Sequence, residues 1–105
     1  MTVIHVIATV ELVEGKRAAF LAEFRKIVPL VRAEEGCLDY GPAVDVATGL
    51  AAQGPVRDNV VMVVEKWASL DALKKHLQAP HMLDYRPKVK DFVVAAALQV
   101  LAPVE

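Results

Sequence analysis

The sequence predicts one α+β domain, spanning residues 1–105, in which strands and helices follow the order βαββαβ. Two observations lead to this prediction. Four segments carry alternating or nearly continuous apolar residues, which is typical of strands, and in the segments between them apolar residues recur every three or four positions, which is typical of helices. In addition, no linker, internal repeat or low-complexity stretch divides the chain, and its length suits a single core.

The first half of the chain predicts a strand, a helix and a second strand. Residues 2–12 are rich in β-branched side chains, with every even position from 4 onward apolar, so one face of this strand should be buried. The helix carries its apolar stripe over residues 20–31 and should kink at Pro29, which lacks a backbone donor. Gly36 ends the helix, and residues 37–46 form the second strand.

The second half predicts a strand, two short helical pieces and a last strand. Residues 60–67 are apolar at nearly every position, and Ser69 is a good N-cap for the helix that follows. The buried stripe of that helix should consist of Leu70, Leu73 and Leu77. Pro80 opens a further helical piece, and residues 95–102 form the last strand. This order predicts an antiparallel sheet with the helices on one face, the ferredoxin-like arrangement.

The chain is apolar for a small domain. Hydrophobic residues make up 55% of it, against about 45–50% in typical soluble domains. The excess falls on the first, third and last strands, which carry apolar residues on both faces. Because a sheet face turned away from the helices would otherwise meet water, we expect a second copy of the chain to cover it in a homodimer.

Charge and hydropathy exclude several partners. Lys and Arg number 12 and Asp and Glu number 13, without a basic cluster, so we expect no nucleic acid as a partner. The longest apolar run, residues 92–98, is too short to span a bilayer, and residues 1–5 lack the basic start of a signal peptide, so no membrane partner is expected. The single cysteine allows no internal disulfide, in keeping with a cytoplasmic protein.

Chemically useful side chains gather between residues 65 and 82. His76 follows Leu73 by three positions, so its ring should lie at the boundary between core and open space, where it could titrate and contact a ligand. His81 and Tyr85 are four residues apart and can meet on one helix face. The simpler interpretations are a surface histidine at a helix edge and packing at a helix start.

Glu65 and Trp67 point to the same side of their strand. Unless it is paired, a carboxylate on that apolar face would have a raised pKa, which is one way to make a general base. The alternative is an end-of-strand residue that reaches solvent or pairs with Lys66 or Arg86. Trp67 offers a flat wall for an aromatic ligand or is simply core. His5 and Tyr40 are equally open to a pocket role or a packing role. The histidine spacings match no zinc signature, so no metal site is expected.

In this stretch the sequence resembles a known family. Glu65-Lys66-Trp67, Ala72-Leu73, His76 and Pro80-His81 resemble, in order and spacing, the signature of the antibiotic-biosynthesis monooxygenase (ABM) family. The stretches 26–29, 34–37 and 98–101 look closer still to the bacterial quinol monooxygenases within it. The resemblance covers essentially the whole chain.

The resemblance implies a dimeric α+β barrel that oxidises or oxygenates quinols or related electron-rich aromatics with O₂, without a flavin, haem or metal cofactor. It carries the family's positions onto Glu65, Trp67, His76 and His81. The family's haem-degrading branch uses an asparagine and an axial histidine, near whose positions this chain has Thr9 and Arg86. Haem degradation is therefore not expected.

We expect a quinol to lie between the sheet and the second helix, with His76 as the base and with His81 or Glu65 orienting or replacing it. The side chains expected to contact it are Trp67, Tyr40, Tyr85, Met62, Met82, Leu73 and His5. Two other functions stay open. One is a non-catalytic barrel of the stress-response type that binds a small aromatic ligand, and the other is an isomerase-like barrel with His76 as a proton shuttle.

Overall fold

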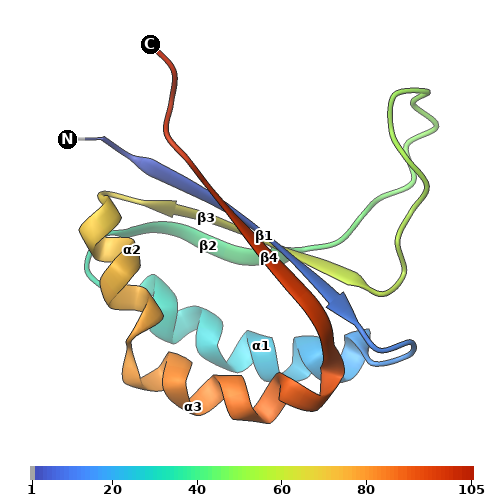
Figure 1. The fold of residues 1–105 in the computed structure, drawn as a ribbon, viewed down its shortest axis with the longest axis horizontal. Helices are drawn as coiled ribbons and strands as arrows, with labels where there is room; N and C mark the ends of the chain where they lie inside the picture. The colour runs from blue at the N-terminus through green and yellow to red at the C-terminus, as the bar shows by residue number, and fades with distance from the viewer. Residues whose placement is uncertain (1) are drawn as a thin grey trace.

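A four-stranded antiparallel sheet forms one layer of the protein and helices form the other (Figure 1). The computed structural model describes residues 2–105. The strands are β1 (Ile4–Leu12), β2 (Cys37–Ala43), β3 (Val60–Trp67) and β4 (Val93–Leu101), in the spatial order β2-β3-β1-β4. Neighbouring strands are all antiparallel, so the predicted ferredoxin-like fold class is confirmed.

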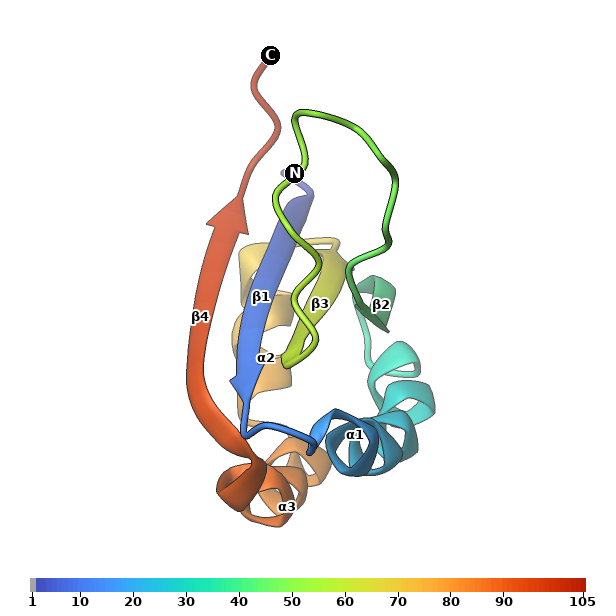
Figure 2. The same ribbon diagram turned by 90° about the vertical axis from the view of Figure 1, so that its right-hand side faces the viewer.

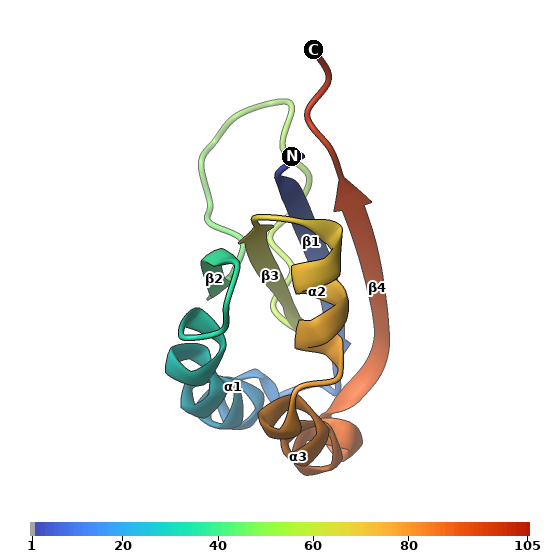
Figure 3. The ribbon, with the colours of Figure 1, turned by 90° about the vertical axis from the view of Figure 1, so that its left-hand side faces the viewer.

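The helix layer consists of α1 (Arg17–Arg32), α2 (Leu70–Leu77) and α3 (Pro80–Val89), with a 3-10 turn, η1 (Lys90–Phe92), before β4. Helices α1 and α3 lie side by side under the sheet, and α2 stands near the start of β2 (Figures 1 and 3). Ser69 caps α2 as predicted, because its hydroxyl accepts from the Ala72 N–H at 3.1 Å. Helix α1 continues past Pro29 to its end at Arg32. No helix within residues 2–105 is long and apolar enough to cross a membrane.

Strand alternation gives the sheet an inner face toward the helices and an outer face away from them. Figure 2 shows the four strands side by side, with α1 and α3 below them. On β1 the inner residues Val6 and Val10 are buried. The core fills the space between this inner face and the helices. Within it, the Phe24 ring stacks on Phe20 and on Tyr40, with centroids 5.8 and 5.6 Å apart. Aromatic packing of this kind joins α1 to the sheet.

Several strand boundaries differ from the prediction; β1 begins at Ile4 rather than at residue 2, and β4 ends at Leu101 rather than at residue 102. Strand β2 ends at Ala43 rather than at residue 46, because residues 44–59 leave the sheet as a long connection that projects from its far end (Figure 1). Within this connection the Asp45 carboxylate accepts three hydrogen bonds from Arg57, one from its backbone N–H at 3.0 Å and two from its guanidinium at 2.8 and 2.9 Å. Strand β4 begins at Val93 rather than at residue 95, directly after η1.

The buried stripe of α2 also differs from the prediction. Leu73 is buried, but Leu70 is 45% exposed, and His76 is buried instead. The turn at Gly36 explains this, since it has a φ of +84° and approaches α2 so closely that a Cβ there would stand 2.6 Å from the Ala72 Cβ. Because Ala72 faces this turn, Leu70, about 200° away around the helix, faces outward.

Candidate functional site

A cavity of about 260 Å³ lies between the inner face of the sheet and the helices. Most of its lining is apolar and includes Phe20 and Phe24 of α1 and Met82 and Val89 of α3. The polar side chains that line it are Tyr40, Glu65, His76, Tyr85 and Arg86. Pockets for drug-sized ligands run from about 300 to 1,000 Å³. This cavity, just below that range, suits a small and largely apolar molecule.

His76, on α2, is only 2% exposed. Its ring packs against Trp67, with centroids 4.7 Å apart, and meets the Tyr40 ring edge on at 5.4 Å. Burial lowers the pKa of His76 below its ordinary value of 6.5, while the hydrogen bond with Glu34 acts in the opposite direction. The net direction is downward, so the imidazole is neutral at pH 7 and can accept a proton.

Glu34, a carboxylate that the sequence did not single out, connects the two histidines. Its Oε2 lies 2.9 Å from Nδ1 of His76 and 2.7 Å from Nε2 of His81. Helix α1 ends at Arg32, so Glu34 lies in the turn toward β2 rather than on the helix. Its partners follow 42 and 47 positions later in the chain. No local periodicity reports contacts over such separations.

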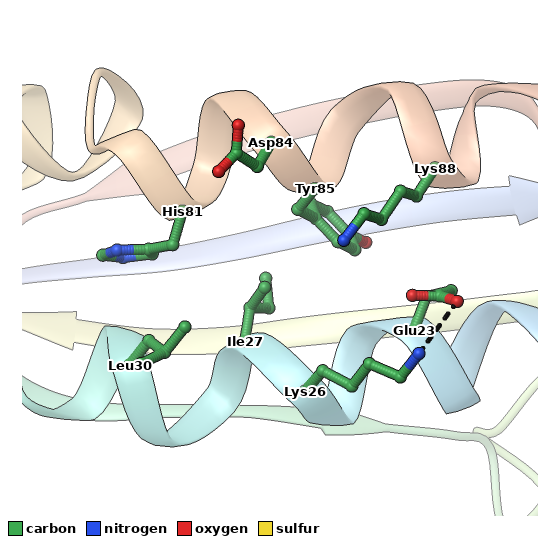
Figure 4. Close-up of a pocket in the computed structure, with 8 residues that line it drawn as sticks. All are labelled: Glu23, Lys26, Ile27, Leu30, His81, Asp84, Tyr85 and Lys88. Atoms are coloured by element: carbon green, nitrogen blue, oxygen red, sulfur yellow. Dashed lines mark hydrogen bonds and ion pairs between the residues drawn. The ribbon is translucent and has the colours of Figure 1, made fainter.

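His81, near the start of α3, links this cluster to the surface. Its side chain is 22% exposed and lines a hollow of about 160 Å³ between α1 and α3, which we call the outer groove. In Figure 4 His81 and Tyr85 project from α3 toward Ile27 of α1. The charged residues of the outer groove are Glu23, Lys26, Asp84 and Lys88. His76, Glu34 and His81 therefore form a continuous polar path from the cavity to this groove.

Glu65 and Trp67 both face the core from β3, as their spacing predicted. The Trp67 Nε1–H donates to Oε1 of Glu65 at 2.9 Å. Burial raises the pKa of Glu65 to about 6, and the bond from Trp67 opposes this rise. Glu65 lines the cavity, but Trp67 is fully buried against the His76 ring and is not part of the lining. Trp67 thus supports its two polar neighbours instead of forming a wall for a ligand.

Two phenols, Tyr40 of β2 and Tyr85 of α3, lie at the cavity. Burial raises the pKa of each phenol, so both remain protonated hydrogen-bond donors at neutral pH. Met82 lines the cavity beside them, whereas Leu73 is buried in the core and does not reach the lining. The structure therefore brings Tyr40, Tyr85 and Met82 to the place expected of them.

Met62 and His5 lie on the outer face of the sheet and do not reach the cavity. Met62 is paired with Thr9 on β1, and His5 is paired with Lys66 and Leu101. Successive side chains of a strand point to opposite faces, so Met62, an odd number of positions from Trp67, faces the other way. The expectation that Met62 and His5 contact a ligand beside Trp67 is corrected accordingly.

Arg86 was not expected at the site but lies at the edge of the cavity. Its Nη2–H donates to the carbonyl oxygen of Leu77 at 2.6 Å, which holds the guanidinium between α2 and α3. Glu65, which could have paired with Arg86, is bonded by Trp67 instead. Arg86 therefore places a positive charge next to any anionic form of a ligand in the cavity.

Cys37 opens β2 close to the same carboxylates. It is a free, half-buried thiol. Burial raises its pKa, and the nearby negative charges of Glu34, Glu65 and Asp39 raise it further. At neutral pH the side chain is therefore a thiol rather than a thiolate.

The fold is an antiparallel α+β fold with a small apolar cavity. A neutral imidazole lies in the wall of the cavity and a carboxylate binds the imidazole from behind, an arrangement typical of enzymes that act on small molecules. Within residues 2–105 no group of three or more His, Cys, Asp or Glu is arranged to hold a metal ion. The chain belongs to the antibiotic biosynthesis monooxygenase family, whose model matches residues 3–88. It is thus a member of a family of monooxygenases.

Individual relatives agree with this assignment. The chain is 45% identical over 87 residues to the protein named probable quinol monooxygenase YgiN of Escherichia coli K12, a match that covers 83% of each chain. Among solved structures, Rv0793 of Mycobacterium tuberculosis has a TM-score of 0.79 at 28% identity, covering 98% of this chain and 96% of that one. PA3566 of Pseudomonas aeruginosa has a TM-score of 0.82 at 24% identity, covering 100% and 97%, which shows the shared fold.

Proposed function

We propose that the protein is a cofactor-independent monooxygenase or oxidase that acts on quinols or related electron-rich aromatic compounds with O₂. The observation that carries this proposal is the neutral imidazole of His76 at an apolar cavity, with its Nδ1 engaged by Glu34. The name of the E. coli relative supports the quinol class. We place the activity in the cytoplasm, in keeping with the free thiol of Cys37.

Proton removal is the protein's proposed contribution. A quinol hydroxyl gives its proton to Nε2 of His76, and the resulting phenolate gives an electron to O₂ far more readily than the phenol does. Tyr40 or Tyr85 donates a hydrogen bond to the second oxygen of the ring. Glu65, whose pKa of about 6 leaves it mostly ionised at pH 7, orients the substrate hydroxyl or replaces His76 as base. The apolar lining holds the ring in place and excludes water.

The substrate supplies all the electrons. In simple oxidation, the quinol gives two protons and two electrons to O₂, which yields the quinone and hydrogen peroxide. In oxygenation, one atom of O₂ enters the ring to give a hydroxyquinone, and the other leaves as water with two hydrogen atoms. Both routes balance without an added reductant.

Oxygen uptake tests the function. Protein dialysed against a chelator, with no flavin or haem added, should consume O₂ saturably in the presence of a reduced naphthoquinone, faster than the quinol autoxidises. Product mass then distinguishes the quinone from the hydroxyquinone. Saturable quenching of Trp67 fluorescence by the oxidised quinone without O₂ uptake would instead identify a non-catalytic binding protein. A product formed without oxygen would identify an isomerase.

We also propose that two copies pair through the outer face of the sheet. This face carries Val64 in its middle, 42% exposed, and Leu101 near one end, 43% exposed. Ile7, directly across from Val64 on β1, extends the same apolar surface. Polar residues such as Thr9 and Gln99 lie beside these side chains, so the exposed apolar area is a central patch, which a monomer would leave in water. A second sheet packed against it would cover these side chains.

A charge in the middle of that face should separate the two copies. We expect the wild-type protein to scatter light as a dimer at low micromolar concentration and Val64→Glu to scatter as a monomer of 11.4 kDa. Leu70→Glu is a matched control, because Leu70 is similarly exposed, at 45%, but lies on the helix layer. A monomeric wild-type protein would refute the pairing.

A further inference from the structure

Resting on the proposed function, we propose that Glu34 is a positioning residue for His76. Its carboxylate keeps the imidazole proton on Nδ1, so that Nε2 meets the substrate hydroxyl with a free lone pair, and it stabilises the imidazolium that then forms. Glu34 does not line the cavity, so it acts through His76. His81 shares the same oxygen of Glu34 and connects it to the outer groove.

Glu34 reaches both histidines because the chain around it is held in place. The Glu34 N–H donates to the carbonyl of Val31 at 2.9 Å, which closes the end of α1. Two residues later the carbonyl of Gly36 accepts from the Ala68 N–H at 2.8 Å, which ties this turn to the start of α2. The Glu34 side chain is only 14% exposed. Its hydrogen bonds with the imidazoles are therefore shielded from water. A hydrogen bond to a charged acceptor is stronger in such a shielded place than in water.

The contacts of the carboxylate determine where the His76 proton lies. A carboxylate has acceptor sites only, so each imidazole must turn an N–H toward Oε2. For His76 the nitrogen in contact is Nδ1, and the neutral ring then has no hydrogen on Nε2. Nε2 has no hydrogen-bond partner among residues 2–105. In that part of the chain, every side-chain nitrogen or oxygen that is fully enclosed has such a partner. Nε2 therefore borders open space, and the cavity that His76 lines is that space.

The other charged groups nearby do not duplicate this role. The titratable and charged side chains around His76 are Tyr40 from β2, Glu65 from β3, Glu34 and Cys37 from the turn into β2, and His81 and Arg86 from α3. The outer groove that His81 lines also carries the charged side chains Glu23, Lys26, Asp84 and Lys88 (Figure 4). Only Glu34 is within hydrogen-bonding distance of both imidazoles among the described residues.

Glu34→Gln tests the role, with Glu35→Gln as the matched control, since Glu35 is the exposed neighbour with the same charge. An amide can donate to Nδ1 as well as accept from it, so it no longer fixes the tautomer. We expect kcat for quinol-dependent O₂ uptake to fall about 10–100-fold, the loss usual when the hydrogen-bond partner that orients a metal-bound histidine is removed. The acid limb of the pH profile should move to lower pH, because the hydrogen bond that Glu34 accepts raises the pKa of His76. Unchanged kcat and an unmoved limb in Glu34→Gln would overturn the proposal.

The nitrogen chemical shifts of the His76 ring test the same point without turnover. In the wild-type protein at neutral pH they should report a proton on Nδ1 and none on Nε2, and Glu34→Gln should show a mixture of tautomers. A wild-type ring protonated on Nε2 overturns the role of Glu34 whatever the activity. A ring protonated on Nδ1 in a wild-type protein that consumes no O₂ supports the role of Glu34 and contradicts the proposed function instead.

Discussion

Replacing His76 with alanine is expected to lower kcat for quinol-dependent O₂ uptake by about 10²–10⁴-fold, the usual contribution of a general base. His76 is the one imidazole that lines the cavity formed by residues 2–105, and its Nδ1 is already engaged. The base works only when deprotonated, so kcat/KM of the wild-type protein should rise with pH through the pKa of His76. That midpoint lies below 6.5. The limb should be absent in His76→Ala.

Controls separate lost chemistry from lost stability. Removing a buried ring leaves a hole and destabilises the fold, so kcat is compared at a temperature where thermal unfolding shows the variant to be folded. Lys75→Ala changes the exposed neighbour on the same helix and should leave kcat within about two-fold, since isolated surface substitutions have small effects. If His76→Ala keeps the wild-type kcat and pH profile, the base is another group, with Glu65 the next to test.

Gly36→Ala is expected to destabilise the protein by at least about 2 kcal/mol, measured by urea unfolding. A residue with a side chain held at φ +84° is strained by about 1–3 kcal/mol. The new Cβ would also stand 2.6 Å from the Ala72 Cβ, which forces α2 to move. Because Glu34 lies two residues before this turn and His76 lies on α2, the same shift should lengthen their contact and lower kcat.

Gly15→Ala is the matched control for this effect. Gly15 has nearly the same backbone conformation, with φ +80°, but no atom lies within 4 Å of where its Cβ would stand. The stability lost in Gly15→Ala therefore measures backbone strain alone. The additional stability lost in Gly36→Ala measures the collision of the new Cβ with α2. Equal losses in the two variants would show that α2 gives way freely at Ala72, contrary to the expected rigid contact.

Local patterns predicted most of the fold because they depend on neighbours in sequence. The strand over residues 60–67 was predicted at its observed bounds, and the Ser69 cap was predicted from a contact only three residues long. The orientation of α2 was not predictable in this way. Leu70 and His76 lie on either side of Leu73, and the turn at Gly36, far away in sequence, determines which of them is buried.

The site was predictable only in part for the same reason. Glu65 and His76 were identified because each is a polar residue beside an apolar pattern, and such a residue stands out locally. Glu34 belongs to an ordinary charged pair before a glycine, and its contacts cross 42 and 47 positions. Met62 shows the opposite failure, because the alternation of β3 was sufficient to exclude it from the face of Trp67.

The environment of Cys37 affects how readily its thiol is oxidised during turnover. In the simple-oxidation route O₂ leaves as hydrogen peroxide, and peroxide attacks thiolates much faster than thiols. Glu34 and Glu65, proposed to assist proton transfer, also help to keep the neighbouring sulfur protonated. The same negative charges that serve turnover would thereby protect the single cysteine of the chain from oxidative self-damage.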